Sequence, residues 1–321
     1  MRYKKIGFIG FGKWVKNAYL PFIQKLEDAE ISYVCAKSNS TILEAQKIIG
    51  DQSKYTRDYN ELLEDSELDL VILSVPDEMH GHIMNDILSK NIDCIFEMPI
   101  AEKNIVSEKL ISISKSKKNL LVPNLEFSHL PIISRLHKYV INKSYGKLTR
   151  VNLKLLSPGW GPIETSIKTI YSISPWYIDV LNKILGVTPK RVLSVGEKNP
   201  TYESESKGFT ILDYDEYWGF WDYDIESSEK LSVTLDMVFD NAAVKVDLIN
   251  SKYEVVKNEV VDKFTEDFFT PVQGWPGMNE FLQHFFNNEL PREVYIKEIE
   301  TLQNISNAME LSLQKNQWIK L

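Results

Sequence analysis

The chain has 321 residues, of which 43% are hydrophobic, and it carries a formal net charge of −8. This length exceeds that of a usual single-core protein, so the composition predicts two folded domains and excludes extended disorder. No block of Lys or Arg is dense enough to follow a nucleic-acid backbone, and no apolar run reaches the roughly 18 residues of a membrane span.

The two cysteines, Cys35 and Cys94, each lie in an apolar, β-like run. They are typical of small buried side chains and indicate neither a disulfide framework nor a metal site. The first residues lead directly into a strand, without the apolar segment and cleavage site of a secretory signal. We therefore expect a soluble, cytoplasmic protein.

Strands and helices are expected to alternate through the first third of the chain, which indicates parallel βαβ units. Farther along the chain, the alternation of strands and helices gives way to successive strands. We place the domain boundary before this change, near residues 121–125. We expect a Rossmann domain at residues 1–123 and a second domain at residues 124–321. In the first domain the expected strands are 5–9, 31–36, 68–74, 93–96 and 120–123, and the expected helices are 13–26, 40–49, 59–63, 81–89 and 107–115.

The second domain shows period-two strand patterns instead, which predict an open, largely antiparallel sheet with helices over one face. The expected fold class is therefore α/β: a doubly wound parallel sheet followed by an α+β domain. Its expected strands are 147–156, 191–195, 231–239, 242–250, 253–257 and 259–264, and its expected helices are 131–141, 177–185, 279–287 and 294–315.

A glycine-rich loop follows the first strand. Gly10 allows a tight turn and Gly12 lets the backbone approach a pyrophosphate, while the following helix presents its N–H groups to the anion. The third glycine position of the pattern holds Val15, so helix and strand are expected to pack less closely there. We expect Gly10, Phe11, Gly12, Lys13 and Trp14 to contact a dinucleotide; a similar loop without a ligand is the alternative.

The second strand ends in Ala36, Lys37 and Ser38, where an NAD site usually places an acid for the ribose 2′-hydroxyl. A lysine followed by hydroxyls suits a 2′-phosphate, so the sequence favours NADP over NAD. The alternative is that Lys37 is a solvated loop lysine.

The glycine loop, the run Val71–Pro76 with Ser74 and Pro76, His80, and the segment Glu97-Met98-Pro99 together resemble the Gfo/Idh/MocA family of oxidoreductases. The resemblance extends over nearly the whole chain. It implies a Rossmann domain, a substrate domain on a large open sheet, and association into dimers or tetramers through that sheet. It also implies hydride transfer, with Ser74, Pro76, His80 and Glu97 near the cofactor.

Two positions depart from the pattern of the family. The resemblance aligns Met98 with the lysine of a Glu-Lys-Pro motif and Trp176 with a histidine, the groups that move the proton of the reacting hydroxyl. It aligns Ser172 with an aspartate and keeps an aspartate at Asp179. Because a thioether and an indole are not bases, the usual oxidation of a sugar alcohol would need another proton-handling group.

Candidates for the missing catalytic group are Asp179, Tyr177 and Glu126. Each has a structural alternative: Asp179 can brace its helix, and Glu126 can form a surface ion pair. We expect the substrate pocket to include Met98, His129, Trp160 and Trp176, an aromatic surface that suits a substrate less polar than a free sugar. No metal site is expected.

Residues 213–224 interleave aromatic side chains with carboxylates, so they can either stack on a flat or cationic ligand or form an edge strand or subunit contact.

The leading expectation is an NADP(H)-dependent oxidoreductase with an atypical site, reducing a C=N or C=O group of a biosynthetic intermediate. Two alternatives stay open. The chain can be a non-catalytic cofactor-binding or assembly protein of the same fold, or a sugar or inositol dehydrogenase with displaced catalytic groups. We expect a small-molecule substrate and a homodimer or homotetramer, without nucleic acid or membrane.

Overall fold

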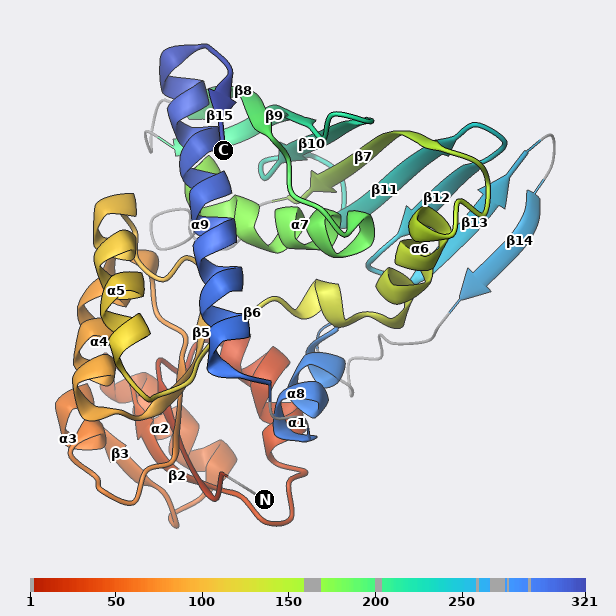
Figure 1. Ribbon diagram of the computed structural model, residues 1–321. Coiled ribbons are helices and arrows are strands. Elements are labelled where there is room, and N and C mark those ends of the chain that lie inside the picture. The colour runs from red at the N-terminus through yellow and green to blue at the C-terminus, as the bar shows by residue number, and fades with distance from the viewer. Residues whose placement is uncertain are drawn as a thin grey trace. The chain divides into compact units, whose positions relative to one another are not determined.

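The computed structural model describes residues 3–158, 169–199, 204–257, 260–265, 275, 277–287 and 290–321 (Figure 1). The chain divides into two compact units. The first comprises Met1–Asn124 and Pro271–Thr301, and the second comprises Leu125–Thr270 and Leu302–Leu321. Residues 271–301, at the far end of the sequence, thus belong to the unit that contains the glycine loop.

Among the described residues, the first unit holds a six-stranded sheet in the order β3-β2-β1-β4-β5-β6, and every strand pair is parallel. This order reverses direction between β1 and β4, which is where open α/β sheets bind their ligands. The strands are β1 (Lys5–Ile9), β2 (Glu30–Cys35), β3 (Lys54–Thr56), β4 (Leu70–Leu73), β5 (Asp93–Glu97) and β6 (Leu121–Asn124).

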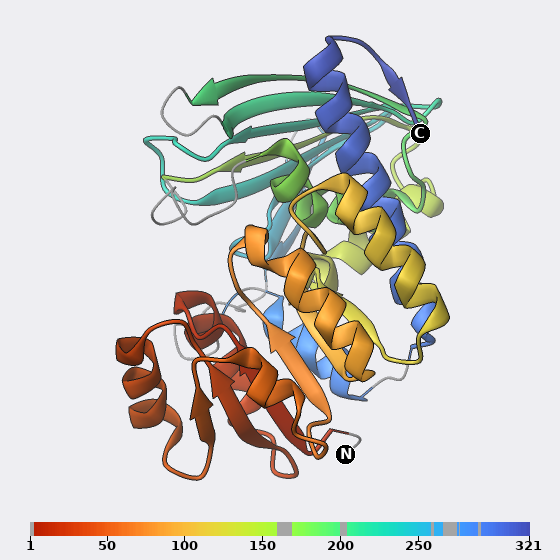
Figure 2. The same ribbon diagram turned by 90° about the vertical axis from the view of Figure 1, so that its left-hand side faces the viewer.

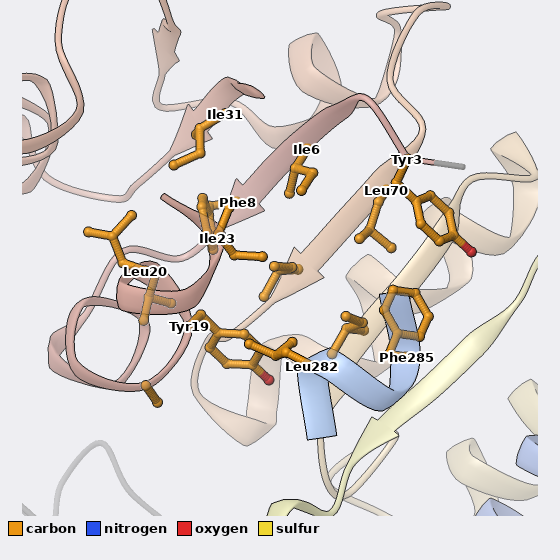
Figure 3. Packing of buried hydrophobic residues seen from close by; sticks show 14 of the residues in the cluster. Tyr3, Ile6, Phe8, Tyr19, Leu20, Ile23, Ile31, Leu70, Leu282 and Phe285 are labelled. Carbon is orange, nitrogen blue, oxygen red and sulfur yellow. The ribbon is translucent and has the colours of Figure 1, made fainter. Parts of the chain in front are cut away.

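Helices lie on both faces of this sheet, because each buried strand presents apolar side chains alternately to one face and then the other. One face packs against η1 (Val15–Tyr19), α1 (Leu20–Ile23), α2 (Asn39–Ile49) and α8 (Met278–Asn287). Figure 3 shows Leu282 and Phe285 of α8 beside Tyr19 and Tyr3 in this core. The other helices are α3 (Tyr59–Leu63), α4 (Asp77–Lys90) and α5 (Asn104–Ser116), of which α4 and α5 lie side by side (Figure 2).

The helix after the glycine loop differs from a regular α-helix. The sequence predicts a helix over residues 13–26; the structure has a π-helical turn at Val15–Tyr19 followed by the short helix α1. The side chain of Val15 is fully buried at the third glycine position. Such π-helical turns are rare in proteins and occur frequently at functional sites.

The second unit is built on a nine-stranded sheet, counted over the described residues, in the order β14-β13-β12-β11-β7-β10-β9-β8-β15. The pair β7 and β10 is parallel and the other described pairs are antiparallel. The strands are β7 (Leu148–Leu156), β8 (Arg191–Asn199), β9 (Ser204–Asp213), β10 (Trp218–Asp224), β11 (Ser232–Phe239), β12 (Ala243–Asp247), β13 (Lys252–Val256), β14 (Val260–Thr265) and β15 (Ile319–Lys320).

Helices cover one face of the nine-stranded sheet (Figure 1). The ring of Tyr177 on α7 stacks on Trp221 of β10, and Tyr139 on α6 hydrogen-bonds Tyr253 of β13. These contacts place α6 and α7 on the face of the sheet that carries the buried side chains Trp221 and Tyr253. The helical elements are η2 (Glu126–His129), α6 (Pro131–Ile141), α7 (Ile170–Leu185) and the part of α9 (Arg292–Lys315) that follows Thr301. The expected α/β fold class is confirmed.

Three differences from the predicted elements concern the site. Strands β3, β9 and β10 were not predicted, and residues 213–224 do not form an edge strand, because β10 lies between β7 and β9. Helix α7 begins at Ile170, whereas the sequence predicts a start at Tyr177. Pro175 misled that prediction, since proline is most common in the first turn of a helix but here lies inside one.

Candidate functional site

The glycine loop has the geometry that its sequence predicts. Gly10 adopts φ +93°, and a Cβ at this position would lie 1.9 Å from the carbonyl oxygen of Ser74. Only glycine fits there. A Cβ at Gly12 would meet nothing within 4 Å, and this residue is exposed. The loop thus combines a fixed turn at Gly10 with open space at Gly12, where a phosphate can approach the backbone.

The neighbouring loop residues differ in exposure. Phe11 is buried, Trp14 is half-buried and Lys13 is exposed. The backbone N–H of Gly10 donates to the carbonyl of Cys35 at 2.9 Å, which joins the loop to the end of β2. The loop therefore lies beside the strand end that meets the ribose in a dinucleotide-binding fold.

The end of β2 carries no carboxylate. Ala36 is buried, and Lys37 and Ser38 are exposed. Ser38 caps α2, accepting a hydrogen bond from the Thr41 N–H at 3.1 Å. Sequence reasoning missed Arg57, whose Nε donates to the carbonyl oxygen of Lys37 at 3.0 Å. The signal that would have found it is strand β3, because Arg57 directly follows it.

The turn after β4 is held by a histidine. His80 is fully buried, and its ring nitrogens lie 2.8 Å from the carbonyl oxygen of Pro99 and 2.9 Å from that of Val75. The side chain therefore joins the β4–α4 turn to the turn after β5. Ser74 and Pro76 belong to the same β4–α4 turn, next to the glycine loop.

Glu97, at the end of β5, is the centre of a polar network. Its Oε1 accepts hydrogen bonds from Trp14 Nε1 at 2.7 Å, Tyr19 OH at 2.6 Å and Asn124 Nδ2 at 3.0 Å. Burial raises the pKa of the Glu97 carboxyl, and the hydrogen bonds from Tyr19, Asn124 and Trp14 oppose that shift. The network connects the glycine-loop helix to the ends of β5 and β6. Tyr19 and Asn124 were not among the predicted site residues.

Met98 follows directly and is fully buried, and its peptide bond to Pro99 is cis. A lysine at this position would have to bury its ammonium group, whereas the thioether of Met98 needs no charged partner. Met98 itself therefore cannot exchange a proton at this position.

In the second unit, the three predicted catalytic residues come from two neighbouring elements. Glu126 lies on η2, and Tyr177 and Asp179 lie on α7; all three are buried. The hydroxyl of Ser128 donates to Asp179 Oδ2. Burial raises the pKa of Tyr177 well above its ordinary value, and the Glu126 carboxylate adds to that shift. Tyr177 is thus a neutral phenol that releases its proton less readily than a free tyrosine does.

The positions that the resemblance singled out share one face of α7. Ser172, Trp176 and Asp179 are spaced i, i+4 and i+7, which places them one above another along a helix. Trp176 is 8% exposed, and His129 on η2 is half-buried. Trp160 lies outside the described residues.

The residues of β10 alternate between the two faces of the sheet, with Trp221 and Tyr223 on the buried face. Trp221 stacks between Tyr177 and Tyr223, with ring centroids 5.9 and 4.5 Å away. Trp221 Nε1 and Tyr223 OH are buried and have no hydrogen-bond partner among the described residues. Asp222 and Asp224 alternate with these rings and are half-buried on the other face. Trp221 and Tyr223 therefore do not share a surface with the carboxylates, whereas Trp218 and Phe220 lie on the same face as Asp222 and Asp224.

The described residues contain no group of three or more His, Cys, Asp or Glu side chains that could hold a metal ion. Within the same ranges no helix has the length and apolar character to cross a membrane. A shallow hollow of about 320 Å³ lies between α5 and the start of α9, lined by charged residues that include Lys115 and Glu300. These two pair with each other at 2.7 Å, and no predicted site residue lines the hollow.

The fold and the glycine loop together define a dinucleotide-binding protein: a Rossmann domain with a Gly-x-Gly loop at its switch point, followed by an α+β unit on an open sheet. Residues 4–125 match the GFO_IDH_MocA model, described as an oxidoreductase family with an NAD-binding Rossmann fold. This match confirms, for residues 4–125, the resemblance drawn from the motifs. No curated protein matches the chain.

Solved structures share the fold over nearly the whole length. A levoglucosan dehydrogenase in complex with NADH has 14% identity and a TM-score of 0.79, with 99% of this chain and 98% of that chain covered. GenD2 from gentamicin A biosynthesis, in complex with NAD, has 12% identity and a TM-score of 0.81, with 100% and 97% covered. An oxidoreductase from Agrobacterium radiobacter, in complex with NAD⁺, L-tartaric acid and magnesium, has 13% identity and a TM-score of 0.81, with 100% and 98% covered.

Proposed function

We propose that this protein is an NADP(H)-dependent oxidoreductase that reduces a C=N or C=O group of a small biosynthetic intermediate. The observation that carries the proposal is the glycine loop: Gly10 is locked by the Ser74 carbonyl and Gly12 faces open space. The turn itself requires Gly10, whereas no packing contact requires a glycine at Gly12, and the approach of a phosphate explains it. When bound, the cofactor supplies the hydride; the chain's own residues bind it, orient it and handle the proton.

The preference for NADP rests on charge at the end of β2. Ala36 is a buried residue without a polar group, and Lys37 is exposed beside the hydroxyl of Ser38. A carboxylate at this point would accept from a 2′-hydroxyl and repel a 2′-phosphate, whereas a cation favours the phosphate.

Reduction is favoured over oxidation because of what replaces the lysine. Oxidation of an alcohol needs a base, and the fully buried Met98 cannot be one. An imine is already basic, and the protonated form accepts a hydride without further help. For a ketone, Tyr177, Asp179 or Glu126 would supply the proton.

The substrate surface is proposed to be aromatic. In the second unit, Trp176 on α7 supplies an aromatic side chain, and His129 on η2 adds a half-buried polar group. Such surfaces bind planar, weakly polar molecules better than free sugars.

A second candidate is an NAD(H)-dependent dehydrogenase of a hydroxylated compound, with the proton taken by Asp179 or Glu126. The structurally similar proteins favour it, since levoglucosan dehydrogenase and GenD2 were solved with NADH and NAD. A non-catalytic cofactor-binding protein is the remaining alternative.

We also propose a homodimer or homotetramer that forms through the sheet face away from the helices. This face carries Val195, which is 52% exposed, beside the stacked rings of Phe209 and Phe220. Val195→Lys should dissociate the oligomer in light scattering, while the control Val187→Lys, at a valine 47% exposed outside the sheet, should not. A monomeric wild type would contradict the proposal.

The cytoplasmic location stays a prediction, based on the free, buried thiols of Cys35 and Cys94.

The deciding experiment is a fluorescence titration of the protein with NADPH and NADH, followed by reductase assays against cyclic imines and activated ketones. We expect tighter binding of NADPH, turnover with at least one of these substrates, and a reversed cofactor preference in Lys37→Asp. Preference for NADH together with oxidation of a polyol would support the second candidate. Cofactor binding without turnover in either direction would support the non-catalytic reading.

A further inference from the structure

Arg57 lies next to the strand end that the cofactor proposal depends on. Strands β2 and β3 are parallel neighbours, with Cys35 opposite Thr56, and the Ala36 N–H donates to the Thr56 carbonyl at 3.1 Å. The residues that follow the two strands therefore come together at one edge of the sheet. These residues are Lys37 and Arg57.

The Arg57 side chain is anchored by the backbone of this edge. Its Nε donates to the Lys37 carbonyl oxygen at 3.0 Å. A guanidinium is planar, so one hydrogen bond from Nε fixes the direction of the two terminal nitrogens as well. Arg57 is exposed, and so is Lys37. Two exposed cationic residues thus come from the same edge of the sheet, and the backbone anchors the guanidinium of Arg57.

The two acidic residues that follow Arg57 most closely in the sequence, Asp58 and Glu61, form hydrogen bonds with other groups. Asp58 caps α3 and accepts hydrogen bonds from the backbone N–H and the Nδ2 of Asn60, at 2.9 and 2.8 Å. Glu61 accepts from the Thr56 hydroxyl at 2.5 Å. Neither interaction involves the guanidinium. In these contacts, Asp58 and Glu61 therefore do not neutralise the positive charge of Arg57.

We propose that Arg57 determines the cofactor specificity, by binding the phosphomonoester on the adenosine ribose of NADP(H) together with Lys37. A guanidinium presents two parallel N–H groups to a phosphate, and such charge-assisted pairs are stronger than a single ammonium contact. The ribose of a dinucleotide binds at the end of β2, which is where the Lys37 carbonyl holds Arg57. This inference rests on the proposed use of NADP(H) and adds a residue that neither the motif nor the resemblance indicated.

The test measures dissociation constants for NADPH, NADH, 2′,5′-ADP and 5′-AMP with the full chain and three variants. Arg57→Gln removes the charge, Arg57→Lys keeps it without the planar fork, and Lys47→Gln removes an exposed cation at the other end of α2. We expect Arg57→Gln to weaken NADPH and 2′,5′-ADP by about 10- to 100-fold and to leave NADH and 5′-AMP unchanged. Arg57→Lys should recover part of the loss, and Lys47→Gln should match the wild type.

Two results would overturn the inference but not the proposed cofactor. In the first, the wild type prefers NADPH and Arg57→Gln keeps that preference. In the second, Arg57→Gln loses equal affinity for NADPH and NADH, which would mark Arg57 as a residue that only stabilises the structure. A wild type without any preference for NADPH would overturn both the inference and the proposed cofactor. Thermal unfolding of each variant verifies that the comparison is made on folded protein.

Discussion

The carbonyl oxygen of Ser74 occupies the space where Gly10 would carry a side chain, 1.9 Å from the position of its Cβ. The two residues lie at the ends of neighbouring strands, β1 and β4, and the Ser74 N–H donates to the Ile9 carbonyl at 2.9 Å. This contact fixes the glycine loop at the switch point of the sheet before any cofactor binds. Gly12, two residues later, has no such neighbour.

The two glycines should therefore respond differently to alanine. Gly10→Ala places a methyl group on a backbone carbonyl and should lower the free energy of unfolding by about 3 kcal/mol or more. Gly12→Ala should change it by less than about 0.5 kcal/mol, yet weaken dinucleotide binding at least about 10-fold, because the methyl group blocks the phosphate. Denaturant unfolding and cofactor titration check both. Unaltered binding in a folded Gly12→Ala protein would contradict the cofactor site.

Glu97 should make the stability depend on pH in a particular direction. Its pKa is raised by burial, so the folded state holds the proton more tightly than the unfolded state does. The stability that the protonated Glu97 contributes is present in full below the ordinary pKa of a glutamate. It is lost as the pH rises through the raised pKa of the folded state. Glu97→Gln keeps an acceptor for Trp14, Tyr19 and Asn124 but cannot ionise.

The difference in unfolding free energy, Glu97→Gln minus wild type, should therefore grow in favour of the variant as the pH rises above the ordinary glutamate pKa of about 4.3. Urea titrations at several pH values measure it, and Glu102→Gln, at a half-buried glutamate nearby in the sequence, serves as the control. A flat difference would mean that the hydrogen bonds to the carboxylate cancel the effect of burial.

Restoring the lysine at Met98 should not restore a dehydrogenase. Met98→Lys buries an ammonium group at a fully buried position and should cost about 3 kcal/mol or more, whereas Met98→Leu should cost less than about 1.5 kcal/mol. Reductase activity should fall or stay unchanged in Met98→Lys. A large gain in polyol oxidation by Met98→Lys combined with Trp176→His would instead identify a decayed sugar or inositol dehydrogenase.

The proton donor should be identifiable among three buried residues. Asp179→Asn, Tyr177→Phe or Glu126→Gln should lower turnover by roughly 10²-fold, the scale of a removed general acid, with cofactor affinity retained. Ser128→Ala is the matched control for Asp179, because it removes the hydrogen bond to the carboxylate but keeps the carboxylate itself. Equal losses in Ser128→Ala and Asp179→Asn would show that Asp179 braces α7 and does no chemistry. Full activity in all of the substituted proteins would exclude these residues as the donor.

Local pattern was sufficient for much of the fold. The strand Lys5–Ile9 and the helices Tyr59–Leu63 and Pro131–Ile141 have the bounds that periodicity predicts, since each depends on the apolar face of a single segment. Gly10 was predictable for a similar reason, because a positive φ directly after a strand requires glycine. The family, too, was readable from short motifs.

Contacts between distant segments decided the rest. Trp14 and Glu97 are separated by 83 residues, and Ser128 and Asp179 by 51, so no local pattern indicates which donor each carboxylate binds. Strand β10 lies inside the sheet because it pairs in parallel with β7. The alternation of its side chains does not indicate this partner. Arg57 reaches the Lys37 carbonyl only because β3 pairs with β2. Side-chain periodicity determines which face of an element is buried, whereas the partner across that face is chosen when the whole chain packs.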